Sequence, residues 1–179
     1  MKRPHWYLRF YGDPILRTVA KQVEKVTAEV QDLANLMVEN LIQDHAAGMA
    51  AVQYGEATRL FVLRFDEWHV DGRVSLGTPY VFINPILSEP SKETERMEEG
   101  CVSIPGIRLP VDRPYQITVE ALDINGEPFT MRPEGIFARG VMHENDHLNG
   151  QLIIDRTPPF YRKRAEPLLR DLKKRHSTG

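Results

Sequence analysis

Apolar positions recur at helical spacing in two stretches of the chain and predict two amphipathic helices. The first covers about residues 27–44, where apolar side chains return every three or four positions. The second lies between Pro133 and Gly150, because proline suits the first turn of a helix and glycine suits the position just after its end. The tail, residues 160–179, has the composition of a third helix, although Pro167 would be expected to interrupt it.

Runs rich in phenylalanine, valine and isoleucine predict strands over residues 58–65 and 79–87. Residues 115–133 alternate between apolar and polar types around an Asn-Gly pair, a pattern typical of a β-hairpin. Together these elements predict one α+β domain over residues 1–179. We expect mostly antiparallel strands around one central helix, with an N-terminal helix and a basic, helical C-terminal tail.

Composition and charge narrow the class of protein. With 41% hydrophobic and 27% charged residues, the chain is a globular mixture, which excludes a disordered or low-complexity protein. A formal net charge of -2 gives no support for sequence-specific nucleic-acid binding or for attachment to a membrane surface. The apolar runs are too short for a membrane helix, and residues 1–14 do not resemble a secretory signal. Because Cys101 is the single cysteine, no internal disulfide can form, and we expect a cytoplasmic protein.

The strongest chemical signal is an HExxH motif on the central predicted helix, formed by His143, Glu144 and His147 with two residues between. Residues four positions apart lie on one face of a helix, so both imidazoles can bind one metal ion. The glutamate between them can reach the water that such an ion holds. Since both histidines fall on the stripe that faces the core, the motif predicts a catalytic metal site.

A catalytic tetrahedral site needs a third protein ligand, and the residues alone leave this ligand open. The metzincin pattern would place a histidine at position 153, where this chain has Ile153. Glu166 could serve as in thermolysin-like sites, but it stands among arginines and lysines, as a solvated surface residue would. The thiolate of Cys101 is a strong ligand for zinc or ferrous iron, although a lone cysteine is more often a small buried hydrophobic residue.

Three motifs, taken in their order along the chain, resemble those of the peptide deformylase family. Residues 48–53, GMAAVQ, are similar to the family pattern GφGφAAxQ, in which φ is apolar. Residues 99–103, EGCVS, are similar to EGCφS, and residues 143–148, HENDHL, are similar to QHExDHL. Each motif alone has limited specificity, whereas all three in this order are highly specific. The likeness extends over about residues 10–157.

The sequence departs from the family pattern at three positions. Ala46 replaces the first glycine of the first motif and would strain the loop if that position needs a positive φ. Val52 stands where proline is common. Met142 replaces the glutamine before the first histidine, and the hydrogen bond that a glutamine could make near the metal is therefore lost. None of these changes removes a residue needed for the chemistry, so the expected activity class is unchanged.

The resemblance implies removal of the N-formyl group, as formate, from the N-terminal formylmethionine of nascent polypeptides. Hydroxide formed on the metal ion would attack the formyl carbon, with Glu144 as general base and then as general acid toward the leaving amine. The side-chain amide of Gln53 and the backbone N–H of Val102 would form the oxyanion hole. The metal ligands would be Cys101, His143 and His147.

The same resemblance indicates where the substrate would bind. The backbone of residues 46–48 would pair with the peptide main chain by strand addition, and the methionine side chain would enter an apolar pocket. For the helix residues among these positions, plain core packing is the competing interpretation. Glu99 and Arg113 resemble a family ion pair behind the metal loop, and Asp146 is expected to orient a ligand histidine. The positions assigned to substrate binding are Ala46, Gly48, Gly100, Ile136, Phe137 and Gly140.

The resemblance also implies a cofactor and partners. One divalent metal ion per chain is expected, with Fe²⁺ implied by the family and Zn²⁺, Ni²⁺ or Co²⁺ as alternatives for the same ligands. Residues 160–179 carry seven basic and two acidic side chains, and this tail is expected either to contact the ribosome weakly and in a salt-dependent manner, as some bacterial relatives do, or to be a solvated helix whose basic side aids solubility. A zincin-type endoprotease and a non-enzymatic metal-binding relative are the competing interpretations.

Overall fold

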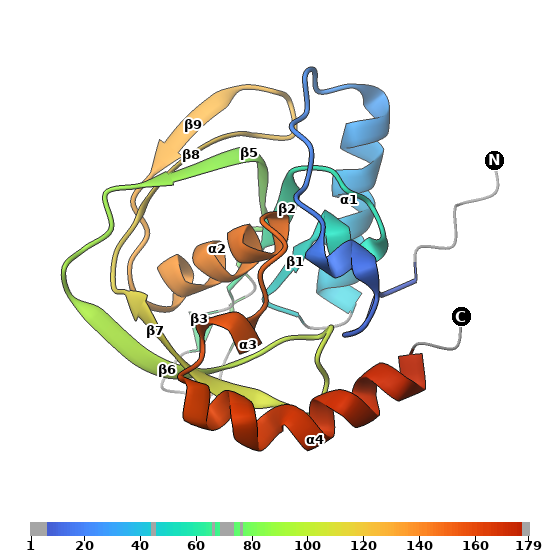
Figure 1. Cartoon of the computed structure of the whole chain (residues 1–179). Coiled ribbons are helices and arrows are strands. Elements are labelled where there is room, and N and C mark those ends of the chain that lie inside the picture. Colours follow the sequence, from blue (N-terminus) through green and yellow to red (C-terminus); the bar gives the residue numbers. More distant parts are fainter. Residues whose placement is uncertain (1–6, 44–45, 66, 69–73, 76, 177–179) are drawn as a thin grey trace.

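A five-stranded antiparallel sheet forms the largest layer of the molecule, in the order β1-β2-β5-β8-β9 (Figure 1). The computed structural model describes residues 7–43, 46–65, 67–68, 74–75 and 77–176. The strands of this sheet are β1 (Gly48–Ala50), β2 (Leu60–Leu63), β5 (Tyr80–Ser88), β8 (Thr118–Leu122) and β9 (Pro128–Met131). The hairpin predicted around the Asn-Gly pair is confirmed by β8 and β9, which are joined by the loop 123–127.

A different helix covers each face of the sheet. α1 (Ala28–Gln43) packs with Leu60 and Val62 of β2, whereas α2 (Gly135–Leu148) packs with the other two residues of this strand. Because successive side chains of a strand point to opposite faces, every residue of β2 is buried, and its sequence, LFVL, is continuously apolar. α1 lies within the range that the hydrophobic spacing predicts.

α2 runs through the centre of the molecule (Figure 1). Its N-cap is Glu134, so Pro133 precedes the helix instead of occupying its first turn as predicted. The chain turns after the helix at Gly150, which has a left-handed φ of 67°. An added Cβ at this position would lie 2.6 Å from the carbonyl oxygen of Arg17. Position 150 therefore requires glycine both for its conformation and for its space.

A second antiparallel hairpin lies on the opposite side of α2 from the main sheet (Figure 1). It consists of β6 (Thr94–Gly100) and β7 (Arg108–Pro114), which pair over their whole length. The hydrophobic pattern did not predict β6, because all its side chains except Glu99 are exposed and its sequence, TERMEEG, does not alternate. The short strands β3 (Glu67–Trp68) and β4 (Val74–Ser75) form a separate pair.

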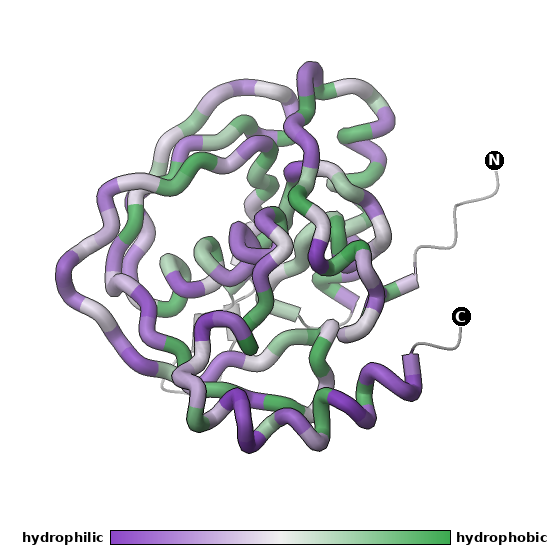
Figure 2. Tube along the Cα trace, viewed as in Figure 1, coloured by the Kyte–Doolittle hydropathy of each residue, from purple (hydrophilic) through white to green (hydrophobic). Residues whose placement is uncertain are grey.

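The C-terminal part of the chain adds α3 (Ile153–Arg156) and α4 (Pro159–His176), and α4 lies along the outside of the molecule (Figure 1). Hydrophobic and hydrophilic residues alternate along α4 (Figure 2), and the buried ones pack on apolar residues of β7 and α3. α4 continues through Pro167, so the expected interruption is wrong. Burial of the apolar face offsets the hydrogen bond that proline cannot donate. The buried residues of α4 are Ala165, Leu169 and Leu172.

Two 3₁₀ helices complete the structure, η1 (Pro14–Arg17) and η2 (Ala51–Tyr54). The segment before η1 reaches the end of α4, where the rings of Phe10 and His176 stack with centroids 4.0 Å apart. No helix in the described part of the chain has both the length and the apolar character needed to cross a bilayer.

Candidate active site

α2 and the loop after β6 bring three metal-ligating side chains together. His143 and His147 lie one helical turn apart on α2, with ring centroids 5.0 Å apart. Sγ of Cys101, the residue that follows β6, lies 3.3 Å from Nε2 of His147. Within the described part of the chain these three residues form the one group of this kind, with all ligand atoms inside 4.8 Å of one another. Glu166, which the sequence left as an alternative ligand, is not a member of this group.

The donor set suits a divalent transition metal. Zinc and iron bind imidazole nitrogen and thiolate sulfur at roughly 2.0–2.3 Å, which places the ligand atoms of a tetrahedral site about 3.3–3.8 Å apart. The distance of 3.3 Å between sulfur and nitrogen agrees with this geometry. Two imidazoles and one thiolate also leave a fourth position, which a catalytic site needs for water.

Glu144 is a buried carboxyl group beside these ligands. Burial raises the pKa of Glu144 to about 7, although the charge of His143 acts in the opposite direction. Among the described residues, its Oε2 atom has no hydrogen-bond partner. A Cβ at Gly48 of β1 would overlap Oε1 of Glu144, so glycine at this position leaves room for the carboxylate. A carboxyl group with this pKa can take up and release a proton near neutral pH.

The side-chain amide of Gln53, a residue of η2, faces the metal-ligating Cys101. Gln53 is 1% exposed. Its Oε1 accepts a hydrogen bond of 2.8 Å from the backbone N–H of Ala50. Its Nε2 donates to Oγ of Ser103 at 3.1 Å and also to Sγ of Cys101 at 3.7 Å. Val102 follows the cysteine directly, and together with Gln53 and Cys101 it lines a cavity beside the metal-ligating residues.

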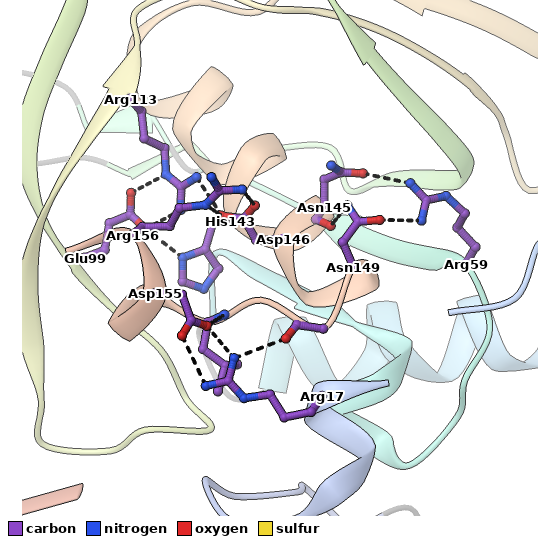
Figure 3. Close-up of polar contacts among 12 residues, drawn as sticks. Arg17, Arg59, Glu99, Arg113, His143, Asn145, Asp146, Asn149, Asp155 and Arg156 are labelled. Atoms are coloured by element: carbon purple, nitrogen blue, oxygen red, sulfur yellow. Dashed lines mark hydrogen bonds and ion pairs between the residues drawn. The ribbon is translucent and has the colours of Figure 1, made fainter. Parts of the chain in front are cut away.

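A buried ion-pair network lies behind His143 (Figure 3). Glu99 accepts two hydrogen bonds from Arg113, of 2.6 and 2.9 Å, which confirms that these two residues form an ion pair. Nδ1 of His143 lies 2.9 Å from Oε2 of Glu99, the oxygen that also accepts one of the two hydrogen bonds from Arg113. Burial acts to raise the pKa of Glu99, but the hydrogen bonds from Arg113 and His143 hold that pKa well below its usual range. The ionised carboxylate thereby fixes the imidazole with Nε2 free for a metal.

The pKa values of the two histidines are shifted in opposite directions. Burial lowers the pKa of His147 far below its usual range, and the charge of His143 adds to this effect. Burial acts in the same direction on His143, but its contacts with Cys101 and Glu99 outweigh it and raise the pKa of His143 well above its usual range. Because a metal binds neutral imidazole, binding at this site would displace the His143 proton.

Asp146 does not orient a ligand histidine, contrary to expectation. Its carboxylate accepts hydrogen bonds of 2.9 Å from Arg113 and 3.0 Å from Arg156 instead (Figure 3). Asp146 therefore has no direct contact with a ligand histidine among the described hydrogen bonds. It binds Arg113, and Arg113 in turn binds Glu99. The sequence analysis named Arg113 as the partner of Glu99 but did not predict that Arg113 also donates to Asp146.

Arg139 is a site residue that sequence reasoning missed. It lies one turn before His143 on α2 and donates a hydrogen bond of 2.8 Å to Oε1 of Glu99. Its guanidinium also donates to the carbonyl oxygens of Val111 and Glu95, at 3.0 and 2.6 Å. A charged residue on the apolar stripe of a helix was the available signal. Its partners remained hidden because they belong to the β6–β7 hairpin, which the pattern did not predict.

A cavity of about 280 Å³ opens onto the metal group. Five of the six positions assigned to the substrate lie on its walls: Ala46, Gly48, Gly100, Ile136 and Gly140. Phe137 is not among the lining residues, because its ring packs with those of Phe65 and Tyr80 at centroid distances of 5.5 and 5.6 Å. These ring contacts agree with the competing interpretation of Phe137, core packing. Phe65 and Arg108 line the cavity without having been predicted.

The departures from the family motifs leave the site intact. Asn84 and Glu89 are the non-glycine residues with positive φ in the described part of the chain. The strain expected at Ala46 is therefore absent. Met142 is buried and belongs to the apolar cluster between α2 and the sheet, so it contributes packing where a glutamine would have offered an amide.

A buried carboxyl group next to an open ligand position can take a proton from water, and this places the chain among the metal-dependent hydrolases. The family model described as polypeptide deformylase matches residues 7–163. The peptide deformylase of Acinetobacter baumannii (strain SDF) is 40% identical over 155 residues, which cover 87% of this chain and 84% of the relative. That of Dictyoglomus thermophilum is 42% identical over 149 residues, which cover 83% of this chain and 90% of the relative.

Solved structures agree with these relatives. The crystal structure of peptide deformylase from Ehrlichia chaffeensis superimposes with a TM-score of 0.84 at 32% identity, over 93% of this chain and 96% of that one. This chain belongs to the peptide deformylase family, the enzymes that remove N-formyl groups from nascent peptides. The predicted α+β fold of antiparallel strands around the HExxH helix is confirmed.

Proposed function

We propose that this chain hydrolyses the formamide bond of N-terminal formylmethionine on nascent polypeptides and releases formate. The observation that carries the proposal is the convergence of the Cys101 thiol with the two α2 imidazoles beside a buried glutamate. All four groups border one cavity or lie directly behind its wall. Membership of the family supplies the class of substrate.

Cys101, His143 and His147 would hold one divalent metal ion, with Fe²⁺ as the proposed native metal and Zn²⁺, Ni²⁺ or Co²⁺ as alternatives. When bound, such an ion acts as a Lewis acid and lowers the pKa of water. The protein fixes two of the ligands before the metal arrives. Glu99 holds the His143 ring through Nδ1, and the rigid turn of α2 places His147 beside it.

Glu144 is the proposed general base and acid. It takes the proton from the attacking water and passes it to the methionine nitrogen as the bond between the formyl carbon and that nitrogen breaks. The pKa of about 7 that burial gives to Glu144 supports both halves of this transfer. The absence of a hydrogen-bond partner for Oε2 among the described residues leaves this atom available to the water.

The formyl oxygen gains negative charge when water attacks, and two donors are proposed to stabilise it. One is the Nε2 amide of Gln53, which the cavity wall presents beside Cys101. The other is the backbone N–H of Val102. Donors that are fixed in place before reaction stabilise a developing charge most effectively.

The peptide is proposed to bind along residues 46–48. β1 stands at the edge of the five-stranded sheet, so an extended peptide can pair with its outer side as an added strand. The methionine side chain would then enter the cavity between Gly100, Ile136 and Gly140, which lie on its walls. Gly48 is suited to this position because a side chain there would collide with Glu144.

We also infer that α4, within the tail 160–179, contacts the ribosome through phosphate groups. Its exposed face carries Lys163, Arg170 and Lys174, which have no ion-pair partner in the described part of the chain. The contact would be weak and salt-dependent. Because nascent chains arise at ribosomes, the proposed place of action is the cytoplasm, with residues 1–179 acting as one catalytic domain.

Formate release from a formyl-Met-Ala peptide tests the proposed function, with protein purified and loaded with Fe²⁺ under anaerobic conditions. We expect turnover of the formylated peptide and none of an acetylated one. Internal cleavage of long unformylated peptides would favour the endoprotease, and stoichiometric metal without turnover would favour a non-enzymatic relative. Either result would contradict the proposal.

The ligand set has its own test. Cys101→Ala removes the one thiolate of the chain, so we expect this variant to lose most of its bound metal and its activity. Metal analysis and formate release would be measured on the same preparation. Full occupancy together with full turnover would remove Cys101 from the site.

A further inference from the structure

The hydroxyl of Ser103 is a buried polar group that the proposed mechanism does not use. Ser103 lies two residues after Cys101, and its side chain is completely buried. Its Oγ lies 3.1 Å from Nε2 of Gln53. Because this hydroxyl has no access to water, its hydrogen bond with the Gln53 amide can hold that amide in place.

The Gln53 amide is held at every atom that can form a hydrogen bond. The Ala50 N–H donates to Oε1 at 2.8 Å, which fixes the oxygen end of the amide. Nε2 carries two protons in the plane of the amide. One goes to Ser103 at 3.1 Å, and the second is therefore directed toward Sγ of Cys101 at 3.7 Å, where the metal ligands converge. Without the serine, the first proton would have no acceptor, and the amide could rotate away.

The main chains of both residues are fixed independently of this hydrogen bond. The backbone N–H of Arg9 donates to the carbonyl of Gln53 at 2.7 Å, and that of Tyr11 donates to the carbonyl of Ser103 at 2.8 Å. One short segment, residues 9–11, thus ties η2 to the loop that carries the cysteine. Removal of the serine hydroxyl should therefore release the amide while both backbones stay in place.

We propose that Ser103 is a positioning residue that accepts one proton of the Gln53 amide and so directs the other toward the formyl oxygen. This inference rests on the proposed function, since it assigns Gln53 to the oxyanion hole. Ser103 itself touches neither substrate nor metal. Its effect passes entirely through Gln53.

Ser103→Ala is the first test, measured with formyl-Met-Ala on Fe²⁺-loaded protein. We expect kcat to fall about tenfold, the effect of one lost buried hydrogen bond, while KM and metal content stay unchanged. Thr157→Val is a matched control. It also deletes a buried hydroxyl, but that hydroxyl has no partner in the described part of the chain, and kcat should not change.

A double-mutant cycle separates positioning from a general structural role. In a Gln53→Ala background, Ser103→Ala should lower kcat by less than about twofold, because the group that the serine directs is already absent. A tenfold fall in that background, or no fall in the wild-type background, would overturn the inference.

A second measurement does not depend on the serine variant folding. In the zinc-loaded, diamagnetic protein, one side-chain proton of Gln53 should exchange slowly with water, with Gln53→Ala used to assign the signal. Fast exchange of both protons would show that Ser103 does not hold the amide. This readout is independent of turnover, so a wild-type protein that fails to release formate would defeat the proposed function without deciding the Ser103 hydrogen bond.

Discussion

At the scale of single residues, the site contrasts two buried carboxyl groups that lie near the same histidine. Burial acts to raise the pKa of Glu99, but its hydrogen bonds with Arg113 and His143 hold that pKa well below its usual range, and Arg139 donates a further hydrogen bond. Glu144 has no arginine partner in the described part of the chain, and burial raises its pKa to about 7. Both carboxyl groups are buried, so their different pKa values come from their cationic partners. Glu144 can therefore exchange a proton near neutral pH, whereas Glu99 serves as a fixed charge.

Replacement of Glu144 by glutamine should separate metal binding from catalysis. The amide has nearly the same size but cannot accept a proton, so we expect unchanged metal content and a fall in kcat of about 100-fold or more. Metal analysis and formate release on one preparation measure both quantities. Glu120→Gln on β8 is a matched control, because that carboxylate is exposed and lies on the main sheet. Turnover at the wild-type rate in the Glu144 variant would show that another group takes the proton.

At the scale of elements, the end of α2 determines how the metal-binding helix meets the N-terminal segment. Gly150→Ala would force alanine into a left-handed conformation and press its Cβ against the carbonyl of Arg17. We expect a loss of about 2–4 kcal/mol in the free energy of unfolding, measured with urea.

Gly106→Ala provides the control for that substitution. Gly106 also has a positive φ, of 76°, but a Cβ there would meet no atom within 4 Å. This variant should lose only about 1–2 kcal/mol, the cost of the backbone conformation alone. If both variants lose the same amount, the close approach of the Arg17 carbonyl has no energetic weight.

Three basic side chains of α4 are exposed to solvent and take no part in its buried face. Reversing the charges of Lys163, Arg170 and Lys174 to glutamate should weaken binding to 70S ribosomes and reduce its dependence on salt. Lys173 is left unchanged, because its side chain packs against Gly12 and its loss would disturb the fold. Binding would be measured at low and at physiological salt.

The control for α4 reverses three exposed basic residues elsewhere on the surface, Lys25, Lys92 and Arg132. These changes alter the net charge of the chain by the same amount. Equal binding of both variants, at every salt concentration, would show that α4 has no particular role in docking.

The burial of each element explains whether the sequence could predict it. α1 buries one face, and the apolar residues with which α2 packs on the sheet also recur at helical spacing, so the pattern predicts both helices. The HExxH motif on α2 marks the metal site directly. β6 buries little besides Glu99, and a strand exposed on both faces leaves no alternation to detect. Because the partners of Arg139 lie on this hairpin, the sequence did not predict the role of Arg139 in the site. The continuation of α4 through Pro167 also depends on tertiary packing, and helix propensity alone cannot predict it.

At the scale of the whole molecule, a bound metal would add a link between parts of the fold that the Glu99 hydrogen bonds already hold together. Two ligands come from α2, and the third follows β6, which belongs to a different sheet from the one that α2 covers. Removal of the metal with a chelator should therefore lower thermal stability. With free metal at about 1,000 times its Kd the stabilisation is about 4 kcal/mol, which corresponds to a shift in Tm of about 8 °C or more.

The thermal test has an internal control. Adding back one equivalent of Zn²⁺ or Ni²⁺ should restore the Tm of the chelated wild-type protein. Cys101→Ala should melt at the same temperature with and without chelator. A chelator-dependent shift in that variant would place the stabilising metal elsewhere.

The segment 9–11 has one more consequence, for the way the protein opens. Chain ends ordinarily fray on their own, at little cost and without effect on the rest of the fold. Here, fraying would leave the buried residues Gln53 and Ser103 with unpaired carbonyls and would also separate Phe10 from His176 at the end of α4. We therefore expect peeling of the N-terminal segment to loosen the Gln53 amide over the cavity and the last turn of α4 at the same time, as one cooperative event.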